Sequence, residues 1–98
     1  MSSLLEYYSL QRKLQQIELS LAEVEREIAE LKEALKWTKE LHPKALYKVF
    51  GKRVVIEVDV ASAEELIQKE IEKLEKVRDV LERERRELLE KLKLGSPQ

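Results

Sequence analysis

The most constraining part of the sequence is residues 45–60, ALYKVFGKRVVIEVDV, because the chain has a helical pattern on both sides of it. This stretch is rich in Val, Ile, Tyr and Phe, whose side chains suit a pleated, half-buried surface. Gly51 and Lys52 separate two apolar runs, and a Gly-X pair at such a point is typical of a two-residue type II′ turn. The stretch therefore predicts one central β-hairpin.

The turn also predicts which side chains share a face of the hairpin. If Gly51 and Lys52 form the turn, Val49 lies opposite Val54 and Tyr47 lies opposite Ile56. One face is then wholly apolar, with Ala45, Tyr47, Val49, Val54, Ile56, Val58 and Val60. A lone hairpin is marginal in water, and two thin helices cannot cover such a face. We therefore expect assembly with copies of the chain or with a related partner. The residues expected to make this contact are Tyr47, Val49, Val54, Ile56, Val58 and Val60.

A heptad pattern precedes the hairpin. Its apolar residues recur at alternating steps of three and four, and the residues between them are mostly charged or amide side chains. Such a pattern, held for about four heptads, predicts a coiled-coil helix. The seam is Tyr7, Leu10, Leu14, Ile17, Leu21, Val24, Ile28, Leu31 and Leu35. Pro43 cannot continue a helix and favours extended geometry at His42, so the predicted helix spans residues 3–41. Trp37, beside this seam, is expected to pack on the base of the hairpin.

The same rhythm follows the hairpin. Its seam is Ile67, Ile71, Leu74, Arg78, Leu81, Arg85, Leu88 and Leu92. Ser62 is a good N-cap and Glu65 completes a capping box, so the second helix is predicted over residues 62–94. Residues 95–98 are predicted to be a frayed tail.

Laid antiparallel about the hairpin, the two seams have matching length. The sequence thus predicts a mainly α fold over residues 1–98, a single domain built as a long two-helix coiled coil with a hairpin at its base. Arg78 and Arg85 interrupt the second seam. We expect their stems to lie on the seam with their charged ends in solvent, which weakens this part of the coiled coil.

Composition argues against several classes of function. The chain has no Cys, one His and two Gly, which leaves no thiolate metal site, no zinc site and no glycine-rich phosphate loop. Its carboxylates are spread over solvated helix faces rather than gathered in pairs. We therefore expect neither an enzyme nor a cofactor.

Charge and hydropathy limit the partners and the compartment. The net charge is −1 with both signs interspersed, so no basic block is present for nucleic acid. No long apolar run predicts a membrane span, and the first residues lack a signal-peptide pattern. These features favour the cytoplasm. The absence of Asn beside abundant Lys, Glu and Arg is a thermophile tendency.

Three short motifs resemble a known family. Residues 47–51 (YKVFG) and 54–56 (VVI) in the hairpin, followed by residues 63–66 (AEEL) at the start of the second predicted helix, are similar to the β-type subunits of archaeal prefoldin. The α-type subunits carry two hairpins, and this chain has room for one. The chain is somewhat shorter than usual β subunits, with less sequence before its first heptad.

The resemblance implies an assembly and a mechanism. Prefoldin is a hexamer of two α and four β subunits whose hairpins form a β-barrel platform. Six coiled coils extend from the platform, and their tips hold unfolded proteins and pass them to a group II chaperonin without ATP. The expected partners are thus an α-type subunit, further copies of this chain, non-native clients and the chaperonin.

The tip of the predicted coiled coil has apolar side chains both on and off the seam. Tyr7, Leu10, Leu88 and Leu92 lie on it and are expected to be structural. The off-seam residues Leu4, Leu5, Tyr8, Leu89 and Leu94 are candidates either for client contact or for capping the coil. The leading hypothesis is an ATP-independent holdase subunit. The alternative is a prefoldin-like scaffold that assembles in the same way without general chaperone activity.

Overall fold

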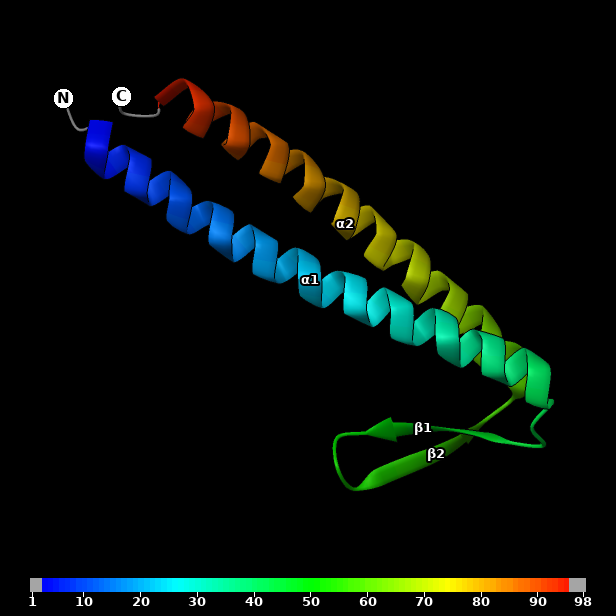
Figure 1. Cartoon of the computed structure of the whole chain (residues 1–98). Coiled ribbons are helices and arrows are strands. Elements are labelled where there is room, and N and C mark those ends of the chain that lie inside the picture. The colour runs from blue at the N-terminus through cyan, green and yellow to red at the C-terminus, as the bar shows by residue number, and fades with distance from the viewer. Residues whose placement is uncertain (1–2, 96–98) are drawn as a thin grey trace. The chain divides into compact units, whose positions relative to one another are not determined.

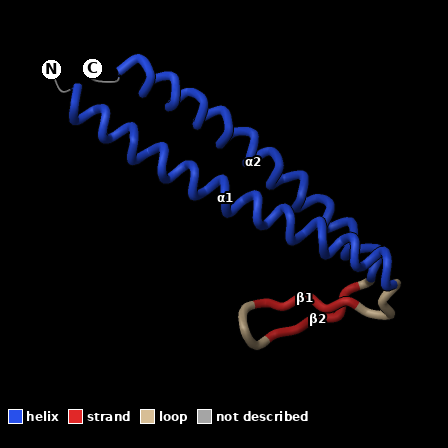
Figure 2. Tube along the Cα trace, viewed as in Figure 1, coloured by secondary structure: helices blue, strands red, loops and turns tan. Residues whose placement is uncertain are grey.

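The computed structural model describes residues 3–95 and follows the order helix, strand, strand, helix (Figure 1). Helix α1 spans Ser3–Leu41 and helix α2 spans Val60–Gly95. Between them, strands β1 (Leu46–Phe50) and β2 (Val54–Val58) pair antiparallel (Figure 2). The mainly helical fold with one central hairpin is therefore confirmed, and the oligomeric β-barrel stays a prediction.

The chain divides into two compact units. In the described part of the chain, unit 1 holds residues 3–26 and 75–95, and unit 2 holds residues 27–74. Unit 1 thus contains the first part of α1 and the last part of α2. Unit 2 contains the rest of both helices and the hairpin.

The hydrophobic core follows the predicted seams. Every predicted seam residue of α1 and α2 is buried or partly buried, including the two arginines. In unit 1 the core centres on Leu21 and Leu88, and in unit 2 on Ile28 and Ile71, of which Ile71 is only 2% exposed. The three-four spacing places these side chains on one stripe of each helix, and burying that stripe stabilises the pairing.

Thr38 extends the buried stripe of α1 past the last predicted position. Its side chain is buried, and its Oγ1 donates a hydrogen bond of 2.8 Å to the carbonyl of Ala34. The hydroxyl is therefore satisfied within its own helix, which removes the cost of burying it. The seam prediction stopped at Leu35 because the next position is polar.

The end of α1 differs from the prediction. His42 has a φ of 47°, so it lies in the left-handed region and is not extended. A left-handed residue directly after the last helical turn is a common helix stop, and Pro43 then prevents continuation. Trp37, expected at the base of the hairpin, is half exposed, and its Nε1 donates to Glu33 Oε1 at 3.4 Å on the same helix.

The start of α2 is capped by Asp59, so the prediction of Ser62 as N-cap is wrong. Asp59 Oδ2 accepts from the backbone N–H of Ser62 at 3.1 Å and from its hydroxyl at 3.2 Å. The first helical bond runs from Ala63 N–H to the Asp59 carbonyl at 2.8 Å. Ser62 therefore occupies the third helical position, where its hydroxyl supports the cap. At the other end Gly95 is helical, and the rest of the predicted tail lies outside the described residues.

The register of the hairpin is shifted by one residue from the prediction. Phe50 pairs with Val54, Val49 with Val55 and Lys48 with Ile56, so the loop contains Gly51, Lys52 and Arg53. Gly51 takes a φ of 62°, which only glycine adopts without strain. Because side chains alternate along a strand, the one-residue shift moves all of β2 to the other face relative to β1.

Candidate functional site

The shifted register gives the hairpin apolar side chains on both faces. Strand alternation and the observed pairs divide the residues into two sets. The first face carries Leu46, Lys48, Phe50, Val54, Ile56 and Val58, and the second carries Tyr47, Val49, Val55 and Glu57. Tyr47 and Val49 thus do not share a face with Val54, Ile56 and Val58, contrary to the prediction.

Most of the predicted assembly residues are exposed. Tyr47, Val49, Val54 and Ile56 are about half exposed or more, and so are two residues that the sequence analysis missed, Phe50 and Val55. Under the predicted register, Phe50 and Val55 lie on the face opposite the wholly apolar one, so they were not among the residues expected to make the contact. Val58 is partly buried at the end of β2, and Val60 is the first residue of α2 rather than part of the hairpin.

An apolar groove lies between the hairpin and the two helices within unit 2. Its volume is about 500 Å³. Its lining residues include Leu31, Thr38, Leu46, Val58, Leu66 and Ile67. The hairpin is therefore not packed flush on its own helices, and apolar side chains are exposed on both of its faces.

Lys48 covers one aromatic side chain of the hairpin. Its Nζ lies 5.0 Å from the centre of the Phe50 ring, two residues along the same strand and on the same face. This cation–π contact holds the ammonium over an exposed ring.

The five off-seam residues at the end of unit 1 form the second candidate surface, here called the terminal cluster. Figure 1 shows the start of α1 and the end of α2 at the same end of this unit. The exposed fractions of the cluster residues range from 38% at Leu89 to 84% at Leu94. The members are Leu4, Leu5, Tyr8, Leu89 and Leu94.

The seam residues beside the terminal cluster are less exposed than the cluster itself. Tyr7, Leu10 and Leu92 are partly buried and Leu88 is buried. Tyr7 also meets Tyr8 edge to face, with ring centres 5.9 Å apart. The helix pairing thus covers the seam but leaves the terminal cluster in solvent.

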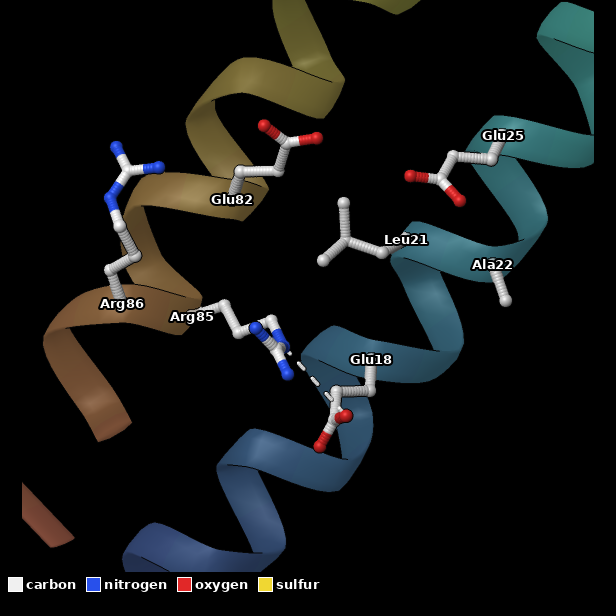
Figure 3. A pocket seen from close by; sticks show the side chains of 7 residues that line it. All are labelled: Glu18, Leu21, Ala22, Glu25, Glu82, Arg85 and Arg86. Carbon is white, nitrogen blue, oxygen red and sulfur yellow. Dashed lines mark ion pairs between the residues drawn. The ribbon is translucent and has the colours of Figure 1, made fainter. Parts of the chain in front are cut away.

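A polar cleft of about 490 Å³ opens between the helices of unit 1, where Arg85 interrupts the seam (Figure 3). The Arg85 side chain crosses towards α1, and its Nε lies 3.7 Å from Glu18 Oε2. Arg78 instead contacts carboxylates of its own helix, with Asp79 at 3.7 Å and Glu82 at 3.8 Å. The aliphatic parts of Arg78 and Arg85 lie on the seam as predicted, but their guanidinium groups contact carboxylates as well as solvent. The role of Glu18 as the partner of Arg85 was not predicted from the sequence.

A metal centre and a membrane-spanning helix are two other kinds of functional feature. Among the described residues, no three His, Cys, Asp or Glu side chains gather closely enough to hold a metal ion. In the same part of the chain, no helix combines the length and apolar character needed to cross a membrane.

Comparisons with known proteins agree with this architecture. The prefoldin subunit family model matches residues 2–94. The crystal structure of the prefoldin beta subunit from Thermococcus strain KS-1 is similar, with a TM-score of 0.85 and 30% sequence identity. This likeness covers 97% of the present chain and 83% of the Thermococcus chain. No match was found among curated proteins.

The family match spans nearly the whole chain, and the solved relative has the same two helices around one hairpin. Prefoldin is a family of non-enzymatic chaperone subunits that assemble with one another. The chain therefore belongs to the prefoldin family, as a prefoldin β-like protein.

Proposed function

We propose that this chain is a subunit of an ATP-independent holdase. It assembles through its hairpin with an α-type prefoldin subunit and with copies of itself, and its terminal cluster holds non-native proteins. By resemblance to archaeal prefoldin, we further propose a cytoplasmic hexamer built on a β-barrel platform, which delivers clients to a group II chaperonin.

The exposure of the terminal cluster carries this proposal. Leu5 and Leu94 are 76% and 84% exposed, whereas the neighbouring seam is covered. Leucine and tyrosine side chains in solvent bind apolar segments of any sequence, because apolar contact is non-directional. Each such side chain contributes about 1 kcal/mol when it is partly covered, so a few of them give weak, reversible holding. Release then needs no nucleotide.

The hairpin supports the assembly part of the proposal. Its apolar side chains are exposed on both faces, and an isolated two-stranded sheet is marginally stable. Pairing with other hairpins would cover these faces and satisfy the strand edges. Native mass spectrometry of the chain alone, and mixed with an archaeal α-type subunit, tests this step. Formation of a hexamer on mixing supports the proposed assembly. A homo-oligomer that does not bind the α-type subunit contradicts it.

The holding step is tested by replacing Leu4, Leu5 and Tyr8 with Ser. We expect the assembly to keep its mass while suppression of aggregation of a chemically denatured protein falls. The measurement is light scattering after dilution of the denatured protein. A matched control replaces exposed apolar residues of unit 1 outside the terminal cluster, Leu19, Val77 and Val80.

Three results would contradict the holding step. If the terminal-cluster variant suppresses aggregation as well as the unmodified protein does, the cluster does not hold clients. If the control variant loses as much suppression as the cluster variant, the effect is one of general surface hydrophobicity or stability. The assembled protein failing to suppress aggregation at all would favour the scaffold alternative.

A further inference from the structure

The terminal cluster lies in a positively charged region of a chain whose net charge is −1. With the Glu18–Arg85 ion pair set aside, residues 4–17 and 86–95 carry five cations and three carboxylates, a net charge of +2. The cations are Arg12, Lys13, Arg86, Lys91 and Lys93, and all are exposed. The rest of the chain is therefore negative.

Helical spacing puts three of these cations next to apolar members of the cluster. Arg86 precedes Leu89 by three residues and Lys93 follows it by four, so both share a helix face with Leu89. Together with Glu90 these three residues line a shallow pocket of about 240 Å³. On α1, Arg12 follows Tyr8 by four residues.

The charges of Arg86 and Lys93 are not engaged elsewhere in the described part of the chain. Within residues 3–95 neither Arg86 nor Lys93 forms an ion pair, whereas the adjacent Arg85 is paired with Glu18. In Figure 3, Arg86 points away from α1 while Arg85 reaches towards it. A partner that lies on Leu89 therefore meets two cationic side chains and one carboxylate.

We propose that the terminal cluster selects non-native polypeptide segments in which apolar side chains adjoin Asp or Glu. This inference rests on the proposed holdase function and adds a charge preference to it. The leucines and Tyr8 supply contact that is indifferent to sequence, and the cations attract carboxylates and repel Lys and Arg. The aliphatic stems of Arg86 and Lys93 can also lie along the bound segment. Steering by the positive field speeds encounter with acidic chains.

The test uses two fluorescent, unfolded peptides of about twenty residues with identical apolar positions. One peptide has Glu and the other has Lys at the intervening positions, and fluorescence anisotropy measures binding to the assembled protein. We expect the Glu peptide to bind about 3- to 10-fold more tightly, the range that two or three exposed charge pairs supply. Raising the salt concentration should reduce this ratio.

Charge-reversal variants locate the preference. Arg86→Glu with Lys93→Glu should bring the ratio to one or invert it. A matched control, Lys73→Glu with Lys76→Glu, makes the same change of charge at exposed positions of α2 outside the cluster and should leave the ratio unchanged. An equal fall of the ratio in both variants would overturn the assignment to the terminal cluster.

The remaining outcomes separate this inference from the proposed function. Equal binding of both peptides overturns the charge preference and leaves the holdase proposal standing. Binding of neither peptide, together with no suppression of aggregation, overturns both. Tighter association with phosphatidylserine-containing vesicles than with either peptide would overturn the polypeptide partner in favour of an anionic membrane surface.

Discussion

Replacing Arg85 with Leu tests whether a half-buried arginine weakens the seam of unit 1. The Arg85 side chain is 42% exposed and that of Glu18 is 48% exposed, so water screens their ion pair to about 0.2–1 kcal/mol. A Leu between Leu81 and Leu88 in the seam would bury about half of its side chain, which contributes roughly 1–1.5 kcal/mol. Glu18 stays half exposed and does not become a buried unpaired charge. We expect the free energy of unfolding to rise by up to about 1 kcal/mol.

Thermal unfolding followed by far-ultraviolet circular dichroism measures this change, at one protein concentration because assembly also shifts the midpoint. For a chain of this size, 1 kcal/mol corresponds to about 4–8 °C, so the midpoint should rise by a few degrees. Glu18→Gln, the control, removes only the ion pair and should lower it slightly. High salt should lower the midpoint of the unmodified protein more than that of the Leu variant. A lower midpoint for Arg85→Leu would refute the reasoning.

Three further predictions concern the elements that the sequence analysis placed wrongly or left untested. Asp59→Ala should cost about 1 kcal/mol of stability and Ser62→Ala only a few tenths, and equal losses in a thermal melt would contradict Asp59 as the cap. Gly51→Ala should lower the free energy of unfolding by about 1–2 kcal/mol. A Cβ at this position meets nothing within 4 Å, so the whole loss comes from the left-handed backbone, and Gly51→Asn should lose less. Val54→Lys with Ile56→Lys should lower the native mass while helix content is kept, and an unchanged mass would remove the hairpin from the assembly interface.

The helices were predictable because their signals are local and repeated. Each seam position from Tyr7 to Leu35 follows from the three-four spacing alone, and the structure covers all of them. The phase of the same pattern puts Leu88 and Leu92 on the seam and Leu89 off it, but it left open whether the off-seam side chains are exposed or cap the coil, and the structure shows them exposed.

The hairpin register and the start of α2 could not be predicted from the sequence alone. At the turn two loop lengths compete, and at the helix start two capping residues compete. Gly51 and Lys52 suit a two-residue turn, but the loop also takes in Arg53, and this one residue reassigns a whole strand to the other face. Asp59 and Ser62 are both good caps, three residues apart, and the helix starts at Val60, directly after Asp59, so that Asp59 is the N-cap. The contact between Glu18 and Arg85 depends on how α1 and α2 pair within unit 1, and the residue types alone do not predict this pairing in enough detail.

The most direct test of the account is to locate where a client touches the assembled protein. The chain has no Cys, so Leu5→Cys and, in a separate protein, Leu19→Cys each give one attachment point for a photoactivatable cross-linker. Both positions lie on α1 and are highly exposed, 76% and 72%, but only Leu5 belongs to the terminal cluster. If the terminal cluster holds clients, a denatured client should form cross-links from position 5 and few from position 19. Equal cross-linking at both, or more at position 19, would contradict it.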